Sequence, residues 1–193
     1  PLGLEATPFT GKQLVEKEPA LRDDLSGAWY YVQDAHLRPN RLMEQWGRVI
    51  VERGVVVEEG VEVQGFEQEG PTITAVNTSE GDYTANQIVV ATGAWSPKLC
   101  TELGISIPIQ PGKGYSITMK RPSICPRIPC LMHERKVLAT PWNSGYRLGG
   151  TMEFSGYDAR INRVRIEAIR RAAPEYLRES EGEIFEDYYW FGW

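Results

Sequence analysis

Residues 87–99, QIVVATGAWSPKL, decide the fold that the sequence predicts. Ile88–Val90 is a β-branched run, typical of strands that are covered on both faces. Ser96 and Pro97 suit the N-cap and the first position of a helix, which we expect over residues 98–103. A buried strand that leads through a short turn into a helix indicates part of a parallel sheet.

Four small residues, Ala91–Ala94, separate this strand from the helix. None of them fills space, so a ligand could approach the backbone closely, and a helix N-terminus favours an anion there. The residues alone equally allow a tight strand–helix connection that binds nothing.

The composition is that of an ordinary globular chain, with 193 residues and a net charge of −5. This charge does not favour a nucleic acid or an acidic membrane as a partner, and no apolar run reaches the roughly 20 residues needed to span a bilayer. Three cysteines suit a reducing compartment, so we expect a cytoplasmic protein.

Cys125 and Cys130 lie near His133, but with no second pair of ligands we expect no metal site. Because the chain starts at Pro1, we expect its natural start to be missing.

Helical spacing occurs in three places. We expect helices over Lys12–Glu18, within Asp34–Gly54 starting at Pro39, and near Ile161–Ala172. The second carries an apolar stripe that we assign to the core: Leu42, Met43, Trp46, Val49 and Ile50. Val55–Val57, one tight turn later, is predicted as a short buried strand of the parallel sheet.

The other expected strands include an antiparallel meander whose last strand re-enters the parallel sheet. The meander starts at Val61, continues over Thr72–Thr78 and turns at Ser79–Asp82. Further strands are predicted over Ser116–Lys120, Val137–Thr140 and Tyr146–Thr151, and the aromatic tail Tyr188–Trp193 is predicted as a last strand. A chain that stops at Trp193 looks cut within an element, so the sequence allows self-association through that edge.

The last helix is rich in arginine, which raises the alternative of a nucleic-acid surface with the aromatic tail as a stacking platform. Six acidic residues separate the two groups and would repel phosphate: Glu175, Glu179, Glu181, Glu183, Glu186 and Asp187. We therefore interpret the arginines as a solvated helix face and expect no nucleic-acid partner.

Four stretches, in this order, carry a family resemblance: LRPNRLMEQW with VERGVVVEEGVEV, then IVVATGAWSPKL, IPIQPGKGYSITM and VLATPWNSGYRLGGTMEFSG. They resemble the FAD-dependent oxidoreductases of the D-amino-acid oxidase superfamily, in the D-amino-acid dehydrogenase and glycine oxidase branch. The resemblance implies an α+β or α/β fold, with an antiparallel substrate-binding sheet, flanking helices and part of a parallel FAD-binding sheet. It also implies three regions: an N-terminal loop and helix over 1–33, a partial FAD-binding domain with the meander over 34–104, and a truncated substrate-binding domain over 105–193.

The resemblance also implies roles for individual residues. Ala91, Thr92 and Gly93 would lie along the FAD, followed by Trp95, and the backbone of Val63 would meet the adenine. On the substrate side, the VLATP stretch implies Leu138 and Thr140 as lining residues, with His133 just upstream. The resemblance implies no catalytic acid or base, because the flavin accepts a hydride from the substrate.

The chain departs from the family pattern in three ways. It contains no GxGxxG, it stops where an Arg-Pro segment with a carboxylate-binding arginine would follow, and it has Leu138 where glycine oxidases often have tyrosine. We therefore expect this chain by itself to bind FAD weakly or not at all, and to be inactive. The expected function of the complete protein is oxidative deamination of (D-)amino acids. Two alternatives stay open: an FAD-dependent dehydrogenase of a 2-hydroxyacid or similar substrate, and a non-enzymatic β-rich binding module.

Overall fold

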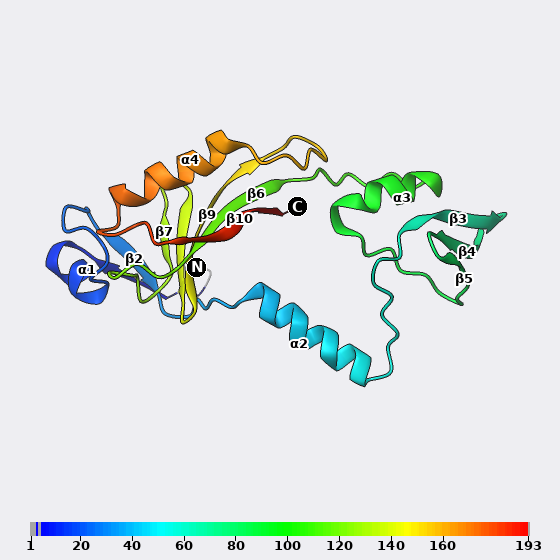
Figure 1. The fold of residues 1–193 in the computed structure, drawn as a ribbon, viewed down its shortest axis with the longest axis horizontal. Coiled ribbons are helices and arrows are strands. Elements are labelled where there is room, and N and C mark those ends of the chain that lie inside the picture. The colour runs from blue at the N-terminus through cyan, green and yellow to red at the C-terminus, as the bar shows by residue number, and fades with distance from the viewer. Residues whose placement is uncertain (1–2, 4, 193) are drawn as a thin grey trace. The chain divides into compact units, whose positions relative to one another are not determined.

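The computed structural model describes residue 3 and residues 5–192, without the side chains of residues 184–192 (Figure 1). The chain divides into two compact units. Unit 1 contains residues 1–36 and 111–193, and unit 2 contains residues 37–110. Each unit is described by itself.

Unit 1 is built on a five-stranded antiparallel sheet with the strand order β10-β6-β9-β8-β7. The strands are β6 (Lys113–Met119), β7 (Cys130–Met132), β8 (Val137–Trp142), β9 (Gly145–Glu153) and β10 (Ile184–Gly192). These strands confirm the antiparallel sheet expected in the second half of the chain. The tail strand is also confirmed as far as Gly192, whereas residue 193 lies outside the described residues.

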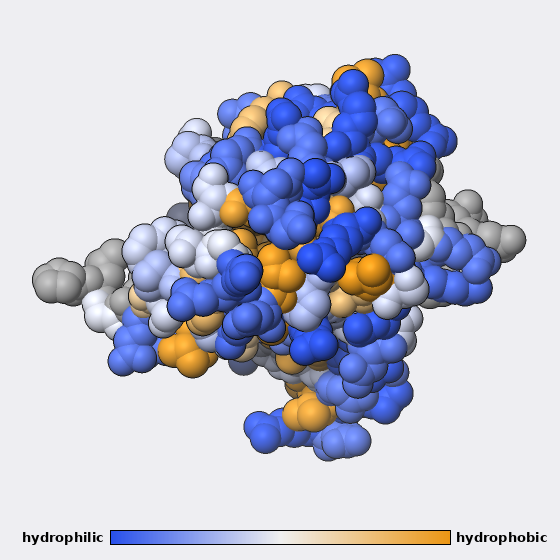
Figure 2. Space-filling view, turned by 90° about the vertical axis from the view of Figure 1, so that its left-hand side faces the viewer, coloured by the Kyte–Doolittle hydropathy of each residue, from blue (hydrophilic) through white to orange (hydrophobic). Residues whose placement is uncertain are grey.

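Alternation along the strands separates a core face from an open face. Ile117, Ala139 and Leu148 are each 0–1% exposed and lie on the core face. Helix α4 (Arg163–Ala172) packs there through Ile166 and Ile169. The expected helix is therefore confirmed, although Val164, part of the apolar spacing that predicted it, is 72% exposed. Figure 2 shows one face of the molecule, where hydrophobic residues form small separate patches among hydrophilic ones.

The N-terminal residues also belong to unit 1. Strands β1 (Ala6–Phe9) and β2 (Ala28–Tyr31) form a two-stranded ribbon, with α1 (Gly11–Lys17) between them. The buried carboxylate of Glu18 follows this helix. One oxygen accepts a hydrogen bond from the Ala20 backbone N–H at 3.1 Å, and the other accepts from the N–H groups of Arg127 and Ile128 at 2.7 and 3.1 Å. Glu18 thus ties the end of α1 to a proline-rich loop before β7.

Unit 2 contains a long helix and the predicted meander. Its elements are α2 (Pro39–Glu52), β3 (Val63–Glu69), β4 (Thr72–Thr78), β5 (Gly81–Tyr83), the 3-10 turn η1 (Gly93–Trp95) and α3 (Ser96–Glu102). The meander pairs in the order β3-β4-β5 and is antiparallel throughout. Pro39 occupies the first turn of α2, and Gly54, with φ +86°, follows its end.

Two strands that the sequence predicts in unit 2 do not form. Neither Val55–Val57 nor Ile88–Val90 forms a strand, and Val89 is 85% exposed. A β-branched run becomes a strand only where neighbouring backbone completes its hydrogen bonds, and among the described residues no strand pairs with either segment.

The apolar stripe of α2 is not core in this chain. None of the residues of α2, all of which the structure describes, is buried, and Trp46 is 58% exposed. The spacing correctly predicts one apolar helix face, but burial also requires an element that packs against that face. No helix among the described residues is long and apolar enough to cross a membrane.

The contacts of Glu18 generate a stability prediction. Glu18→Gln replaces a charged acceptor of three backbone hydrogen bonds with a neutral amide, one half of which can only donate. We expect the free energy of unfolding to fall by roughly 2–4 kcal/mol. Urea denaturation measures this change, and Glu16→Gln, at an exposed position on the same helix, is the matched control. Equal midpoints for the two variants would contradict the structural role of Glu18.

Candidate functional site

The open face of the five-stranded sheet carries the first part of the candidate site. Leu138 and Thr140 alternate with buried residues along β8, and Thr140 pairs with Arg147 of β9. Arg147 donates from Nε to the Thr118 hydroxyl at 2.9 Å, and its guanidinium lies 4.9 Å from the Trp142 ring centroid. The hydrogen bond and the cation–π contact hold this charged group on the sheet.

A β-bulge interrupts β9 beside this face. Gly114 pairs with Met152 but Tyr115 pairs with Gly150, so Thr151 is the extra residue. Thr151 has φ +56°, an unusual conformation for a β-branched residue. A Cβ at Gly150 would lie 2.6 Å from the backbone oxygen of Lys136, so only glycine fits there without a shift. Bulges and strained residues of this kind cluster at functional sites.

An open hollow of about 710 Å³ lies at the bulge. Its lining comes from β6, β9, the turn between β7 and β8, and the first turns of α4: Gly114, Tyr115, Ser116, Arg135, Lys136, Arg147, Gly150, Thr151, Met152 and Arg165. Four of these residues are cationic, and none of the described lining residues is acidic. The hollow is therefore suited to a negatively charged group.

Two of the four cations are paired with carboxylates. Nη2 of Arg135 lies 2.7 Å from Oε2 of Glu175, and Nε of Arg165 lies 3.1 Å from Oε2 of Glu153. Lys136 forms no ion pair with a residue that the structure describes, and its Nζ lies 3.4 Å from the His133 ring.

An ion pair between a buried lysine and a largely buried glutamate joins β6 to β9. The fully buried Nζ of Lys113 lies 3.3 Å from Oε1 of Glu153 and donates to the backbone oxygens of Asp158 and Arg160 at 2.7 and 2.9 Å. Burial alone would lower the pKa of Lys113, but interactions with Tyr115 and Glu153 outweigh it and raise the pKa.

Glu153 collects hydrogen bonds from several elements. Its Oε2 accepts from the Tyr115 hydroxyl at 3.0 Å and from Asn162 and Arg165 at 3.1 Å each. Hydrogen bonding from Ser155 above all, then from Tyr115, Asn162 and Lys113, lowers the pKa of Glu153 to about 2 against the opposing effect of burial. Glu153 thus fixes the end of β9 to the start of α4.

The residues expected to contact a cofactor lie in unit 2. Ala91 and Gly93 are exposed, Thr92 bonds through its hydroxyl to Ser96 at 3.1 Å, and Trp95 is 46% exposed. Gly93 has φ +55°, and no atom lies within 4 Å of the position that a Cβ would take there. Val63 starts β3, opposite Thr78, and is half-buried. A small, exposed, irregular backbone fits the approach of a flat cofactor, so these residues are compatible with FAD.

The residues expected on the substrate side lie in unit 1. Leu138 and Thr140 share the open face with Arg147, whereas His133 is exposed in the turn between β7 and β8. None of the three lines the hollow. Lys136, from the same turn as His133, does line it.

The sequence reasoning missed Lys113 and Glu153. Lys113 stands at the start of the alternating run KGYSITM, in phase with the buried Tyr115 and Ile117. That period-2 pattern was the available signal that a charged residue faces the core and needs a partner.

The cysteines show no sign of a metal centre. All three are free, and no group of three or more His, Cys, Asp or Glu side chains within the described part of the chain could hold a metal ion. Burial raises the pKa of the Cys130 thiol to about 12.

Comparison with known proteins gives a consistent family. The family model DAO, described as FAD dependent oxidoreductase, matches residues 1–193. The chain is 34% identical over 161 residues to a D-amino acid dehydrogenase of Granulibacter bethesdensis, covering 82% of this chain and 37% of that protein. It is 31% identical over 168 residues to a glycine oxidase of Pseudomonas putida, covering 85% and 45%. The chain thus spans less than half the length of these curated relatives.

Solved structures agree with this match. A glycine oxidase from Bacillus cereus superposes with a TM-score of 0.78 at 27% identity, covering 91% of this chain and 48% of that chain. An L-proline dehydrogenase from P. horikoshii has the same TM-score at 21% identity, covering 98% and 52%, which is evidence for the fold alone.

The contacts of Glu153 generate a prediction about pH. Its lowered pKa means that Glu153 stabilises the folded state above its unfolded pKa of about 4.3, and that this contribution is lost as the pH falls toward about 2. In Glu153→Gln this part of the pH dependence should disappear. Urea midpoints at neutral pH and at successively lower pH measure it.

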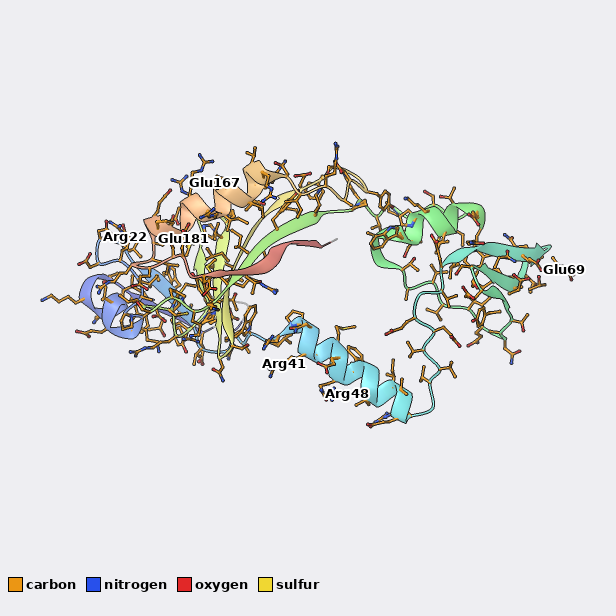
Figure 3. The ribbon with its side chains drawn as sticks, in the orientation of Figure 1. Arg22, Arg41, Arg48, Glu69, Glu167 and Glu181 are labelled. Carbon is orange, nitrogen blue, oxygen red and sulfur yellow. The ribbon has the colours of Figure 1, made fainter. Side chains whose placement is uncertain are left out.

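The matched control is Glu167→Gln, at an exposed position on α4 (Figure 3). It should keep the acid sensitivity of the unmodified protein. If Glu153→Gln and Glu167→Gln lost stability in parallel as the pH falls, Glu153 would not be the anchor described above.

Proposed function

Because this chain belongs to the family of FAD-dependent oxidoreductases, we propose that the protein containing it oxidises amino acids, with D-amino acids as the first candidates. The observation that carries the proposal is the match of the family model to residues 1–193. The 34% identity to a D-amino acid dehydrogenase supports the substrate class. The match argues against the alternative of a non-enzymatic binding module.

We assign the cofactor contacts of this chain to unit 2. Ala91, Thr92, Gly93 and Trp95 would lie along the FAD, and the Val63 backbone would contact the adenine. The exposure of Ala91 and Gly93 and the open space over Gly93 support this assignment. FAD, when bound, supplies the acceptor for the hydride that leaves the substrate α-carbon.

The open face of unit 1 is proposed as the substrate side. Leu138 offers an apolar surface that can exclude water, and Thr140 offers a hydroxyl that can orient a polar group. Arg147, held by Thr118 and Trp142, provides a fixed positive charge beside them. His133 is a weaker candidate, because its exposed position in the turn leaves it outside the lining of the hollow.

Two further proposals concern the cellular location of the protein and its self-association. A cytoplasmic location is supported by three free cysteines. Self-association is supported by the position of β10 at the edge of the five-stranded sheet, where its outer backbone groups have no neighbouring strand among the described residues.

The proposed activity predicts a direct result. The complete protein that contains this chain, loaded with FAD, should lose its visible flavin absorbance when mixed anaerobically with a D-amino acid. L-amino acids, glycine and 2-hydroxyacids form the comparison panel. If only a 2-hydroxyacid reduces the flavin, the amino-acid assignment fails and the dehydrogenase alternative replaces it.

Gly93 allows a test of the cofactor contact. Gly93→Asn adds a side chain at a positive φ that asparagine tolerates, whereas Gly93→Val also strains the backbone. If the small side chain makes room for FAD, both variants should lose bound flavin, measured as absorbance per folded protein. Gly104→Asn, also at a positive φ with open space around it, is the matched control and should keep its flavin. Normal flavin content in folded Gly93→Asn would refute the contact.

A further inference from the structure

Lys136 gives the hollow at the β9 bulge a positive charge that no carboxylate among the described residues pairs with. Two of the other three cations that line the hollow, Arg135 and Arg165, have carboxylate partners in Glu175 and Glu153. Glu134, in the same turn, accepts a hydrogen bond from Tyr176, and its charge interacts with that of Lys136 without forming an ion pair. The charge of Lys136 is therefore available to a ligand.

Two hydroxyl groups strengthen the case for a ligand. Ser116 and Thr151 both line the hollow, and their oxygens are buried without a hydrogen-bond partner among the described residues. Ser116 as a residue is only 6% exposed. A buried hydroxyl without a partner is costly, and a bound oxyanion could accept a hydrogen bond from each of them.

The size and place of the hollow indicate what the ligand is. A volume of about 710 Å³ is in the range of small-molecule sites. Arg147 both lines the hollow and pairs with Thr140 on the open face, so the hollow continues the proposed substrate side within unit 1.

We infer that this hollow binds a carboxylate carried by the substrate side chain, so that the preferred substrate is an acidic amino acid with two carboxylates. The inference rests on the proposed amino-acid oxidation. Lys136 is the specificity-determining residue, because its ammonium can contact the second carboxylate at the rim, while the Ser116 and Thr151 hydroxyls donate from within.

The test compares substrates that carry a second carboxylate with substrates that lack it. The complete protein, loaded with FAD, is mixed anaerobically with D-aspartate and D-alanine, and with D-malate and D-lactate, while flavin reduction is followed. We expect kcat/KM for the dicarboxylate to exceed that for its neutral partner by roughly tenfold or more, as one charge-assisted contact allows.

Lys136→Met should remove this preference by lowering kcat/KM for the dicarboxylate to about the value for its neutral partner. Methionine has a similar length and adds no new backbone strain, because Lys136 already has φ +54°. Lys12→Met, at an exposed position on α1, is the matched control and should keep the preference. Calorimetric titration with succinate and butyrate measures the same difference as binding, independently of turnover, and thermal melting verifies that the variants fold.

Each outcome decides a separate question. Equal or better use of the neutral substrate, or a preference unchanged in Lys136→Met, overturns the inference while the proposed function stands. Loss of bound FAD in folded Lys136→Met overturns it in favour of a cofactor phosphate. Reduction only by D-malate and D-lactate overturns the amino-acid function, and their ratio still decides whether the hollow selects a second carboxylate.

Discussion

The buried ion pair between Lys113 and Glu153 is the constraint on which the site in unit 1 depends. A charged amine with 0% exposure is tolerated only if its donors are satisfied, and here a carboxylate and two backbone oxygens satisfy them. Those backbone oxygens belong to Asp158 and Arg160, in the loop that leads to α4. The need to satisfy one cation therefore fixes β6, β9, this loop and the start of α4 together, and the hollow forms against that framework.

The sequence correctly predicted helix limits and strands where these depend on neighbouring residues in the chain. Pro39 and Gly54 correctly marked the limits of α2, and alternation correctly predicted β4 over Thr72–Thr78. Burial could not be predicted in the same way. Trp46 on α2 and Val89 have the residue types of a core, yet both are exposed, because burial requires a packing partner and not only an apolar side chain.

The candidate site was predictable only in part. Leu138 and Thr140 reach the open face because strand periodicity places them there, and Arg147 joins them through a cross-strand pairing that no single sequence displays. Lys136 and Thr151 were missed because their roles arise from positive backbone angles at a turn and a bulge. Lysine and threonine rarely adopt a positive φ, so their residue types do not indicate this conformation in the sequence.

The close approach of Gly150 to the Lys136 backbone oxygen has an evolutionary consequence. Two backbones in contact set the distance between the turn and the bulge, so the width of the hollow does not depend on the side chains that face it. Mutation can therefore exchange the charged side chains that line the hollow while the backbone around it keeps its dimensions. A lineage could thereby change its preferred ligand charge in single steps, provided that position 150 remains glycine.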